Sequence, residues 1–542
     1  MALNQLYYGD NLKVLRDYIR DESVDLIYLD PPFNSRQDYN VLFKEKDRTE
    51  SAAQITAFED TWEWSVESQR VCEQIIERGG KVSEVIQAFR TFLGHSDMMA
   101  YLAMMAPRLI ELHRVLKPTG SIYLHCDPTA SHYLKMLMDA VFGPSQFRSN
   151  IIWKRTSSHS NASRRYGAVN DDLLFYVKTD AYTFNVQYVP YSQEYLDGFY
   201  RHVDENGRRY RISDLRNPSV RPNLQYEYKG YKPHPNGWAV SKEKMEEYDK
   251  QGRLCYPKSK DGRIQLKRYL DEMPGMHVSN IWDDIPAIHA QAAERLGYPT
   301  QKPEALLERI INASSNEGDI VLDPFCGCGT AVVAAQNLKR QWIGIDITHL
   351  AIGLIKKRLQ DKFGDAIKGA YEIHGEPTDL SSARRLAEED KFQFEAWALS
   401  LVGARHAGQV RRGADHGIDG RLYFHDDKSG KTKQIVISVK AGANVQVAHI
   451  RDLRGVIERE KAAIGVLITL EEPTKPMTKE AAEAGFYKSP SFDREFPRLQ
   501  IITIEQLLSG SEIQHPRMLE VTFKQAPKAK SAKEENLALP LE

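Results

Sequence analysis

Two short stretches of the sequence combine residues that could do chemistry with backbone signals that would position them. In VDLIYLDPPFNS (residues 24–35), an apolar run rich in branched residues ends in Asp30, Pro31, Pro32 and Phe33. The run predicts a buried strand, and the two prolines, which lack a backbone N–H, must end its hydrogen-bond ladder. We therefore expect a carboxylate, a rigid extended turn and an aromatic ring together at the carboxyl end of a strand.

The second stretch, DIVLDPFCGCGTAVVAAQ (residues 319–336), is typical of a strand, a glycine loop and a helix. Gly327 and Gly329 let the backbone approach a ligand, and the helix that follows begins with free N–H groups. Asp346 lies near the end of the next strand pattern, 19 residues after Gly327, where an acid can hold a ribose hydroxyl pair. The loop has no Gly-Lys-Ser/Thr and no third glycine, so it differs from phosphate and dinucleotide loops. The combination predicts a nucleoside-cofactor site.

Length, charge and cysteine content limit the class of protein. The 542 residues are too many for one ordinary core, so two to four domains are expected. The 73 Lys+Arg nearly balance the 74 Asp+Glu, so any basic surface must be local. Five cysteines suit a reduced compartment, and neither a signal peptide nor an apolar run of about 18 residues is present. We expect a soluble, cytoplasmic protein with no membrane partner.

The elements that must position these motifs change character along the chain. Alternating strand and helix signals in residues 1–190 and 291–370 predict an α/β core with a parallel sheet. Short aromatic runs between turn signals in residues 191–290 predict a β-rich insert with a basic, aromatic surface, although an ordinary solvated insert fits that composition equally well. The remaining segments indicate a polar linker (371–390), a third α/β unit (391–512) and a disordered tail (513–542).

DPPF together with DPFCGCGT resembles the β class of DNA amino-methyltransferases, which use S-adenosylmethionine. YYGDNLKVL, NIIWKR with NDDLLFYVK, and TQKPEALLERII fit the same family. The resemblance implies a doubly wound, Rossmann-like core with a target-recognition region in the insert. Two residues of the family's cofactor site also have a structural interpretation. Asp323 could only cap its loop, and Lys302 could be a solvated lysine before a proline-started helix. The cofactor-binding residues that the resemblance implies are Asp323, Phe325, Gly327, Gly329, Thr330, Asp346 and Lys302.

The same resemblance implies direct methyl transfer to the exocyclic amine of a base taken out of the duplex. Asp30 would accept an N–H of that amine, so that the nitrogen lone pair turns toward the methyl sulfonium. A backbone carbonyl of Pro31 and Pro32 would be the second acceptor, and Phe33 would stack on the base. Family members that act on N4 of cytosine usually carry Ser at the position of Asp30. The aspartate therefore favours N6 of adenine, with N4 of cytosine as the alternative.

The C-terminal unit resembles a Mrr-type PD-(D/E)xK nuclease through GADHGIDGRLYF and QIVISVKAG. The resemblance implies that Asp419 holds Mg²⁺ and Lys440 activates water, with Glu395 as the acid of the opening helix. Ser438 stands where an acid or Gln is expected, and serine is a poor ligand for a divalent ion. Three interpretations stay open: an active nuclease, a DNA-binding module that does not cut, and a structural pair of Asp419 with Lys440.

The prediction for the whole chain is a site-specific DNA methyltransferase joined to a C-terminal α/β restriction-endonuclease-like domain. Such an architecture favours a restriction–modification or phage-defence role on double-stranded DNA. The family resemblance adds the expectation of a homodimer and of restriction or defence partner subunits. The alternative of another class is a DNA-binding or sensing protein with little turnover. Nothing in the sequence identifies the recognition sequence.

Overall fold

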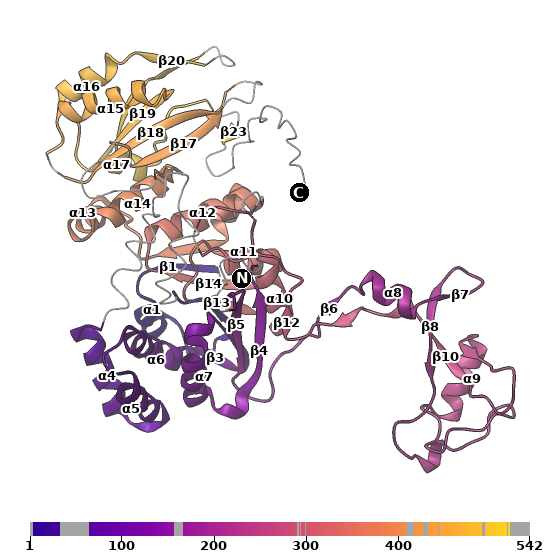
Figure 1. Cartoon of the computed structure of the whole chain (residues 1–542). Helices are drawn as coiled ribbons and strands as arrows, with labels where there is room; N and C mark the ends of the chain where they lie inside the picture. Colours follow the sequence, from indigo (N-terminus) through magenta and orange to yellow (C-terminus); the bar gives the residue numbers. More distant parts are fainter. Residues whose placement is uncertain are drawn as a thin grey trace, which may run out of the picture. The chain divides into compact units, whose positions relative to one another are not determined.

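The computed structural model separates into two compact units, one of residues 1–185 with 280–542 and one of residues 186–279 (Figure 1). No helix among the residues that the structure describes is long and apolar enough to cross a membrane. The structure describes residues 4–32, 64–156, 166–289, 292, 294–296, 298, 300–407, 417–426, 432–442, 444–489, 494–516 and 519–520.

A nine-stranded sheet forms the centre of the first unit, in the order β12-β4-β5-β3-β2-β13-β14-β1-β15. β5 runs antiparallel to its neighbours β3 and β4, and every other neighbouring pair is parallel. The parallel core and its crossing order confirm the doubly wound α/β prediction. The strands are β1 (Asn4–Tyr8), β2 (Val24–Leu29), β3 (Leu116–Cys126), β4 (Phe147–Lys154), β5 (Asn170–Val177), β12 (Ile281–Trp282), β13 (Ile320–Asp323), β14 (Gln341–Asp346) and β15 (Tyr371–His374).

Helices cover both faces of this sheet. Alternate residues of each strand point to opposite faces and so meet different helices. Ile27 and Leu29 pack with the helices of one face. On the other face, the hydroxyls of Tyr123 and Ser314 lie 2.8 Å apart. The first face carries α1 (Asn11–Tyr18), α4 (Val66–Arg78), α5 (Gly80–Leu93), α6 (Asp97–Val115) and α7 (Pro128–Phe142), and the second carries α10 (Glu304–Ser314), α11 (Thr330–Asn337) and α12 (His349–Phe363).

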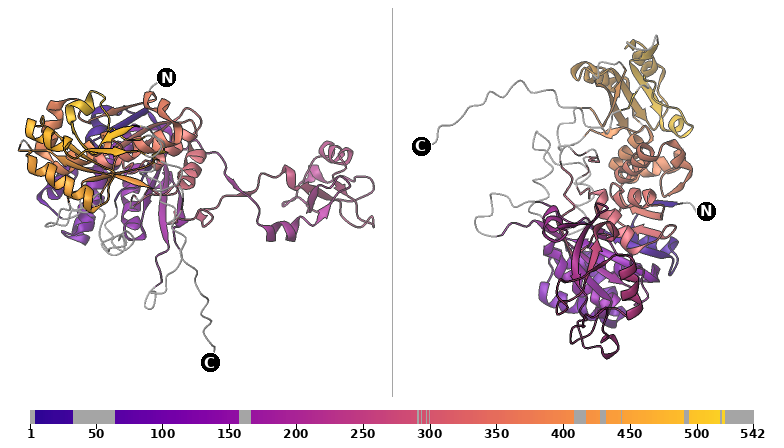
Figure 2. Two further views of the ribbon diagram at one scale, coloured as in Figure 1. Left: turned by 90° about the horizontal axis from the view of Figure 1, so that it is seen from above. Right: turned by 90° about the vertical axis from the view of Figure 1, so that its right-hand side faces the viewer.

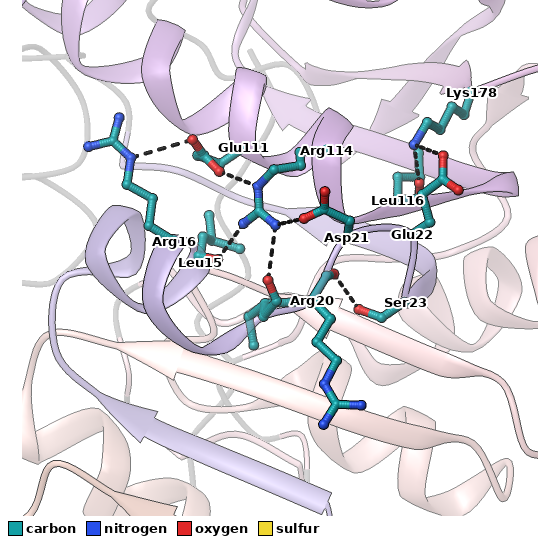
Figure 3. Close-up of polar contacts among 11 residues, drawn as sticks. Leu15, Arg16, Arg20, Asp21, Glu22, Ser23, Glu111, Arg114, Leu116 and Lys178 are labelled. Carbon is teal, nitrogen blue, oxygen red and sulfur yellow. Dashed lines mark hydrogen bonds and ion pairs between the residues drawn. The ribbon is translucent and has the colours of Figure 1, made fainter.

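Arg114, near the end of α6, fixes the turn that leads from α1 into β2 (Figure 3). Its guanidinium donates to the backbone carbonyls of Leu15 (2.6 Å) and Ile19 (3.1 Å), which the end of α1 leaves without helical partners. It also pairs with Glu111 (2.6 Å) and with Asp21. The side chain of Arg114 therefore ties the end of α1 and the turn before β2 to α6.

The second unit, residues 186–279, has a small core of its own around Trp238, Met245 and Ile264. The sequence predicts a β-rich insert, but two helices accompany its short strands. The predicted insert also includes residues 280–290, yet β12 pairs with β4 in the main sheet. Its elements are β6 (Tyr188–Val189), α8 (Gln193–Phe199), β7 (His202–Val203), β8 (Arg209–Asp214), α9 (Lys242–Lys250), β9 (Leu254–Cys255), β10 (Gln265–Tyr269) and β11 (Met276–His277).

The C-terminal sheet, orange to yellow in Figures 1 and 2, has the order β16-β17-β18-β19-β22, and β23 pairs with β17. Two helices, α15 and α16, pack on the face of Val436, and α13, α14 and α17 pack on the face of Ile437. The elements are α13 (Leu380–Glu389), α14 (Lys391–Leu401), β16 (Arg405–His406), β17 (Gly420–His425), β18 (Lys433–Lys440), α15 (Val447–Arg459), β19 (Ile464–Thr469), α16 (Lys475–Ala482), β22 (Leu499–Thr503), α17 (Ile504–Leu508) and β23 (Leu519–Glu520).

Two predicted boundaries around this domain are wrong. The expected linker 371–390 contains β15, which pairs with β1, and α13, whose Ala383 and Leu386 are buried in the C-terminal core. The tail is expected from residue 513, but Ile513 and His515 are buried. Residues 521–542 lie outside the described part of the chain.

Candidate active site

Three carboxylates lie at the carboxyl ends of three adjacent parallel strands. Asp30 follows β2 directly, Asp323 is the last residue of β13, and Asp346 is the last residue of β14. β13 pairs with both of its neighbours, so the three ends meet at one edge of the sheet. In open α/β sheets this edge is where ligands bind. The fold therefore places the two sequence motifs side by side, as expected.

Asp30 is held by Lys302, whose Nζ lies 2.5 Å from its Oδ2. Both side chains are largely buried, with exposed fractions of 14% for Asp30 and 10% for Lys302. Pro31 is also buried, and Pro32 is half-buried. Phe33 lies outside the described residues. The solvated-lysine interpretation of Lys302 is therefore excluded by its burial and its ion pair.

Asp323 and Asp346 are carboxylates in a poorly hydrated environment. Burial raises the pKa of Asp323 well above its ordinary value, and the charges of Asp30 and Asp346 raise it further, although the amide of Phe325 donates to Oδ1 at 3.1 Å. Burial raises the pKa of Asp346 to about 6, against the hydrogen bonds that it accepts. Those bonds come from the amides of Gly327 and Thr348, both at 2.9 Å, and from the Thr348 hydroxyl at 2.8 Å.

The glycine loop needs glycine for both conformation and space. Gly327 and Gly329 have φ angles of 49° and 75°, in the left-handed region. A Cβ on Gly329 would lie 2.6 Å from Cγ1 of Ile355, a neighbour on α12. Arg358, also on α12, donates to the Thr330 hydroxyl at 3.0 Å and to the Cys328 carbonyl at 3.3 Å. The side chains of Ile355 and Arg358 on α12 thus hold the glycine loop in place.

These residues fit S-adenosylmethionine. That cofactor carries a positive sulfonium and an ammonium group, and the site offers three carboxylates against the charge of Lys302. The glycine loop leads straight into α11, whose first amides are free to bind a ligand. Asp346 keeps the position in which a carboxylate can hold ribose hydroxyls. The roles of Asp323, Phe325, Gly327, Gly329, Thr330 and Asp346 in binding it remain predictions.

Sequence reasoning missed Tyr298, Arg358 and a buried polar chain beneath Asp30. The ring of Tyr298 lies over Gly327, where a Cβ would meet its Cε1 at 3.1 Å. Tyr28, two residues before Asp30 and on the same face of β2, has its hydroxyl 2.9 Å from Nδ1 of His125. Nε2 of that histidine lies 3.1 Å from Asp171. None of these residues belongs to a short motif, so only their places in the fold reveal them.

The predicted nuclease residues of the C-terminal domain do come together in part. Oδ2 of Asp419 accepts hydrogen bonds from the hydroxyl of Ser438 (3.1 Å) and the amide of Val439 (2.6 Å), and Nζ of Lys440 lies 3.9 Å from it. Glu395 instead pairs with His406, Oε1 to Nε2, at 2.9 Å.

Among the described residues, Asp419 has a serine and not a second acid beside it. Ser438 donates to the carboxylate of Asp419 where a second acid would share a metal. Among the described residues, no group of three or more His, Cys, Asp or Glu could hold a metal ion. The metal-binding role of Asp419 stays a prediction, and none of the described residues adds a second acid to it.

Comparison with known families matches two regions of the chain. Residues 24–357 match the family described as DNA methylase, the N6/N4 methyltransferases, and residues 386–495 match the Mrr catalytic family, described as restriction endonuclease. The first match covers more than half of the chain. The chain therefore belongs to the N6/N4 DNA methylase family, and it carries a restriction-endonuclease-type domain after the methylase core.

Individual relatives resemble parts of the chain. The type II methyltransferase M.EcaI of Enterobacter cloacae is 33% identical over 50% of this chain and 60% of its own length. The DNA adenine methyltransferase YhdJ of Escherichia coli K12 is 27% identical over 71% of this chain and 92% of its own length. The chain spans 50 to 66% of the length of the first curated relatives that it matches. The structure of a DNA modification methylase from Thermus thermophilus, in complex with S-adenosyl-L-methionine, is 17% identical with a TM-score of 0.34, covering 69% of this chain and 100% of that one.

Proposed function

We propose that this protein transfers a methyl group from S-adenosylmethionine to N6 of an adenine in double-stranded DNA. The observation that carries the proposal is the meeting of Asp30 with the glycine loop and Asp346 at neighbouring strand ends. A base amine held at Asp30 would lie beside a cofactor held at the loop. Membership of the DNA methylase family supports the same reaction.

S-adenosylmethionine, when bound, supplies an activated methyl group on its sulfonium. Asp30 would accept an N–H of the adenine amine, and a carbonyl of the Pro31–Pro32 segment would accept the other. These two bonds would turn the nitrogen lone pair toward the methyl group of the bound cofactor. The C–N bond would form as the S–C bond breaks, and Asp30 would accept the proton that the amine loses and pass it to water. Such positioning can lower the barrier by up to roughly 7–11 kcal/mol.

Adenine is proposed over cytosine because the acceptor is Asp30 and not Ser. The name of the relative YhdJ, a DNA adenine methyltransferase that matches over most of its length, supports this choice. The test is mass spectrometry of nucleosides from DNA incubated with the protein and S-adenosylmethionine. We expect N6-methyldeoxyadenosine; N4-methyldeoxycytidine would establish the alternative base. Less than one methyl group per protein molecule would favour a sensing protein with little turnover.

We further propose that the protein acts within a restriction–modification or defence system, with partner subunits and as a homodimer. The joining of a DNA methylase region to a region that matches restriction endonucleases supports the first part. The class resemblance supports the dimer. Size-exclusion chromatography with light scattering would measure the oligomeric state, and a monomer at working concentration would contradict the dimer.

The C-terminal domain is proposed to bind DNA without cutting it. Its supporting observation is the Asp419 carboxylate, which is bonded to Ser438 and Val439 and is not shared with a second acid among the described residues. The prediction is that purified protein leaves unmethylated plasmid intact in Mg²⁺, with or without S-adenosylmethionine. The matched control is Lys440→Ala. Cleavage by the wild type but not by this variant would instead establish a nuclease with Ser438 as a tolerated change.

A further inference from the structure

Lys302 lies among the carboxylates of the site. Its Nζ contacts Oδ2 of Asp30 at 2.5 Å, and its positive charge also acts on Asp171 at the start of β5 and on Asp323 at the end of β13. The side chain is nine-tenths buried. Lys302, in the segment before α10, therefore contacts Asp30 directly and lies near enough to Asp171 and Asp323 for its charge to lower their pKa values.

The position of Lys302 is fixed by its backbone and by its neighbour in the chain. The carbonyl of Lys302 accepts a hydrogen bond from the Thr330 hydroxyl at 3.3 Å, and Arg358 holds that hydroxyl in turn at 3.0 Å. The side chain of Gln301 donates to the Glu294 carbonyl at 2.6 Å and accepts from the Leu296 amide at 2.8 Å. The backbone of Lys302 and the side chain of Gln301 are thus both held by hydrogen bonds.

The acceptor role proposed for Asp30 requires a charged carboxylate, because a protonated carboxyl group presents a donor to the amine. A buried carboxylate needs hydrogen bonds or an opposite charge to be stable. The Lys302 ammonium at 2.5 Å from Oδ2 supplies that charge and fixes one oxygen. Oδ1 is then left to meet the amine in a single orientation.

We propose that Lys302 is a positioning residue for Asp30: it balances the carboxylate charge and orients the acceptor oxygen, and its ammonium does not serve mainly to bind the cofactor. This inference rests on the proposed methyl transfer. It assigns the lysine to the base side of the reaction, whereas the family resemblance placed it among the cofactor-binding residues.

The first test compares two quantities in Lys302→Gln: the single-turnover rate at saturating S-adenosylmethionine, and the Kd of that cofactor by direct titration. We expect the rate to fall by about 100-fold or more, with little change in Kd. Lys302→Arg should recover most of the rate, because it keeps the cation. The matched control is Lys339→Gln, which changes an exposed lysine just after α11 and should match wild type. A large rise in Kd with an unchanged rate would overturn the inference, as would an arginine variant no better than glutamine.

The second test needs no methylation. Thermal unfolding of Lys302→Gln, Asp30→Asn and the double variant measures the coupling between the two side chains. We expect Lys302→Gln to lower the Tm, and Asp30→Asn in that background to recover part of the loss. Additive effects would contradict the pairing. If wild-type protein does not methylate DNA, the proposed function fails. The comparison of the two single variants with the double variant still decides whether Lys302 pairs with Asp30.

Discussion

Asp346 shows at the scale of one residue how burial can make a binding site depend on pH. Its pKa is raised to about 6 by burial, so the carboxylate is fully ionised only above that pH. The ionised form accepts hydrogen bonds on both oxygens, and the protonated form loses part of that capacity. A ribose hydroxyl pair would therefore be bound best at neutral pH.

We predict that the affinity for S-adenosylmethionine falls as the pH falls through about 6, with Kd rising about fivefold between pH 6 and 5. Titration of the cofactor at pH values from about 5 to 8 measures this change. Asp346→Asn should bind more weakly throughout and should lose the step near its pKa. A step of equal size in that variant would show that another group, such as Asp323, controls the titration.

Single residues of the site were predictable only where they lie in short motifs. Asp30 and the two loop glycines could be identified because each motif occupies one continuous stretch next to a strand pattern. The pairing of Lys302 with Asp30 joins residues 272 positions apart, and no local pattern encodes it. The same holds for Arg358, which reaches the loop from α12. Tertiary contacts of this kind require the fold.

At the scale of the secondary-structure elements, Arg114 helps to position the turn that leads into β2. Its side chain satisfies two carbonyls at the end of α1 and pairs with Glu111 and Asp21. Arg16 also pairs with Glu111, at 3.4 Å, but its side chain is half exposed. Arg114 and Arg16, which both pair with Glu111, should therefore contribute different amounts to the stability of the fold.

Arg114→Ala is predicted to lower the free energy of unfolding of the methylase core by about 2–3 kcal/mol, because two carbonyls and two carboxylates lose their donor. Arg16→Ala is the matched control and should cost no more than about 1 kcal/mol. Urea denaturation followed by circular dichroism would measure both. Equal losses in the two variants would show that Arg114 does not anchor the turn before β2.

Most elements of the core were predictable because their apolar periodicity is strong, as in β13 and α10. The segment that forms α13 favours a linker by composition, because polar residues dominate it. Ala383, Leu386 and Ala387 nevertheless follow the three- and four-residue spacing of a helical face. The aromatic runs of the insert predict strands and do not reveal α9, although Ser241 caps its first turn. In both segments, the composition does not indicate a helix, and tertiary packing stabilises one.

The unit of residues 186–279 is the part of the whole molecule that could be removed cleanly. It has its own core, and the amide of Val278 donates to the carbonyl of Gln187 at 3.0 Å, so its two ends lie side by side. Replacing it by a short Gly-Ser linker is predicted to leave cofactor binding intact and to abolish methylation of DNA. Titration of the cofactor and methyl incorporation measure the two effects. Undiminished methylation at the same sites would contradict a target-recognition role.

For the whole molecule, the central claim is methyl transfer at Asp30. The most direct measurement is mass spectrometry of nucleosides from unmethylated DNA, incubated with S-adenosylmethionine and either wild-type protein or Asp30→Ala, with cofactor Kd measured for both. The account predicts N6-methyldeoxyadenosine from the wild type over many turnovers. It predicts at least about a 100-fold loss in Asp30→Ala, with the cofactor still bound. Undiminished methylation by the variant would contradict the account.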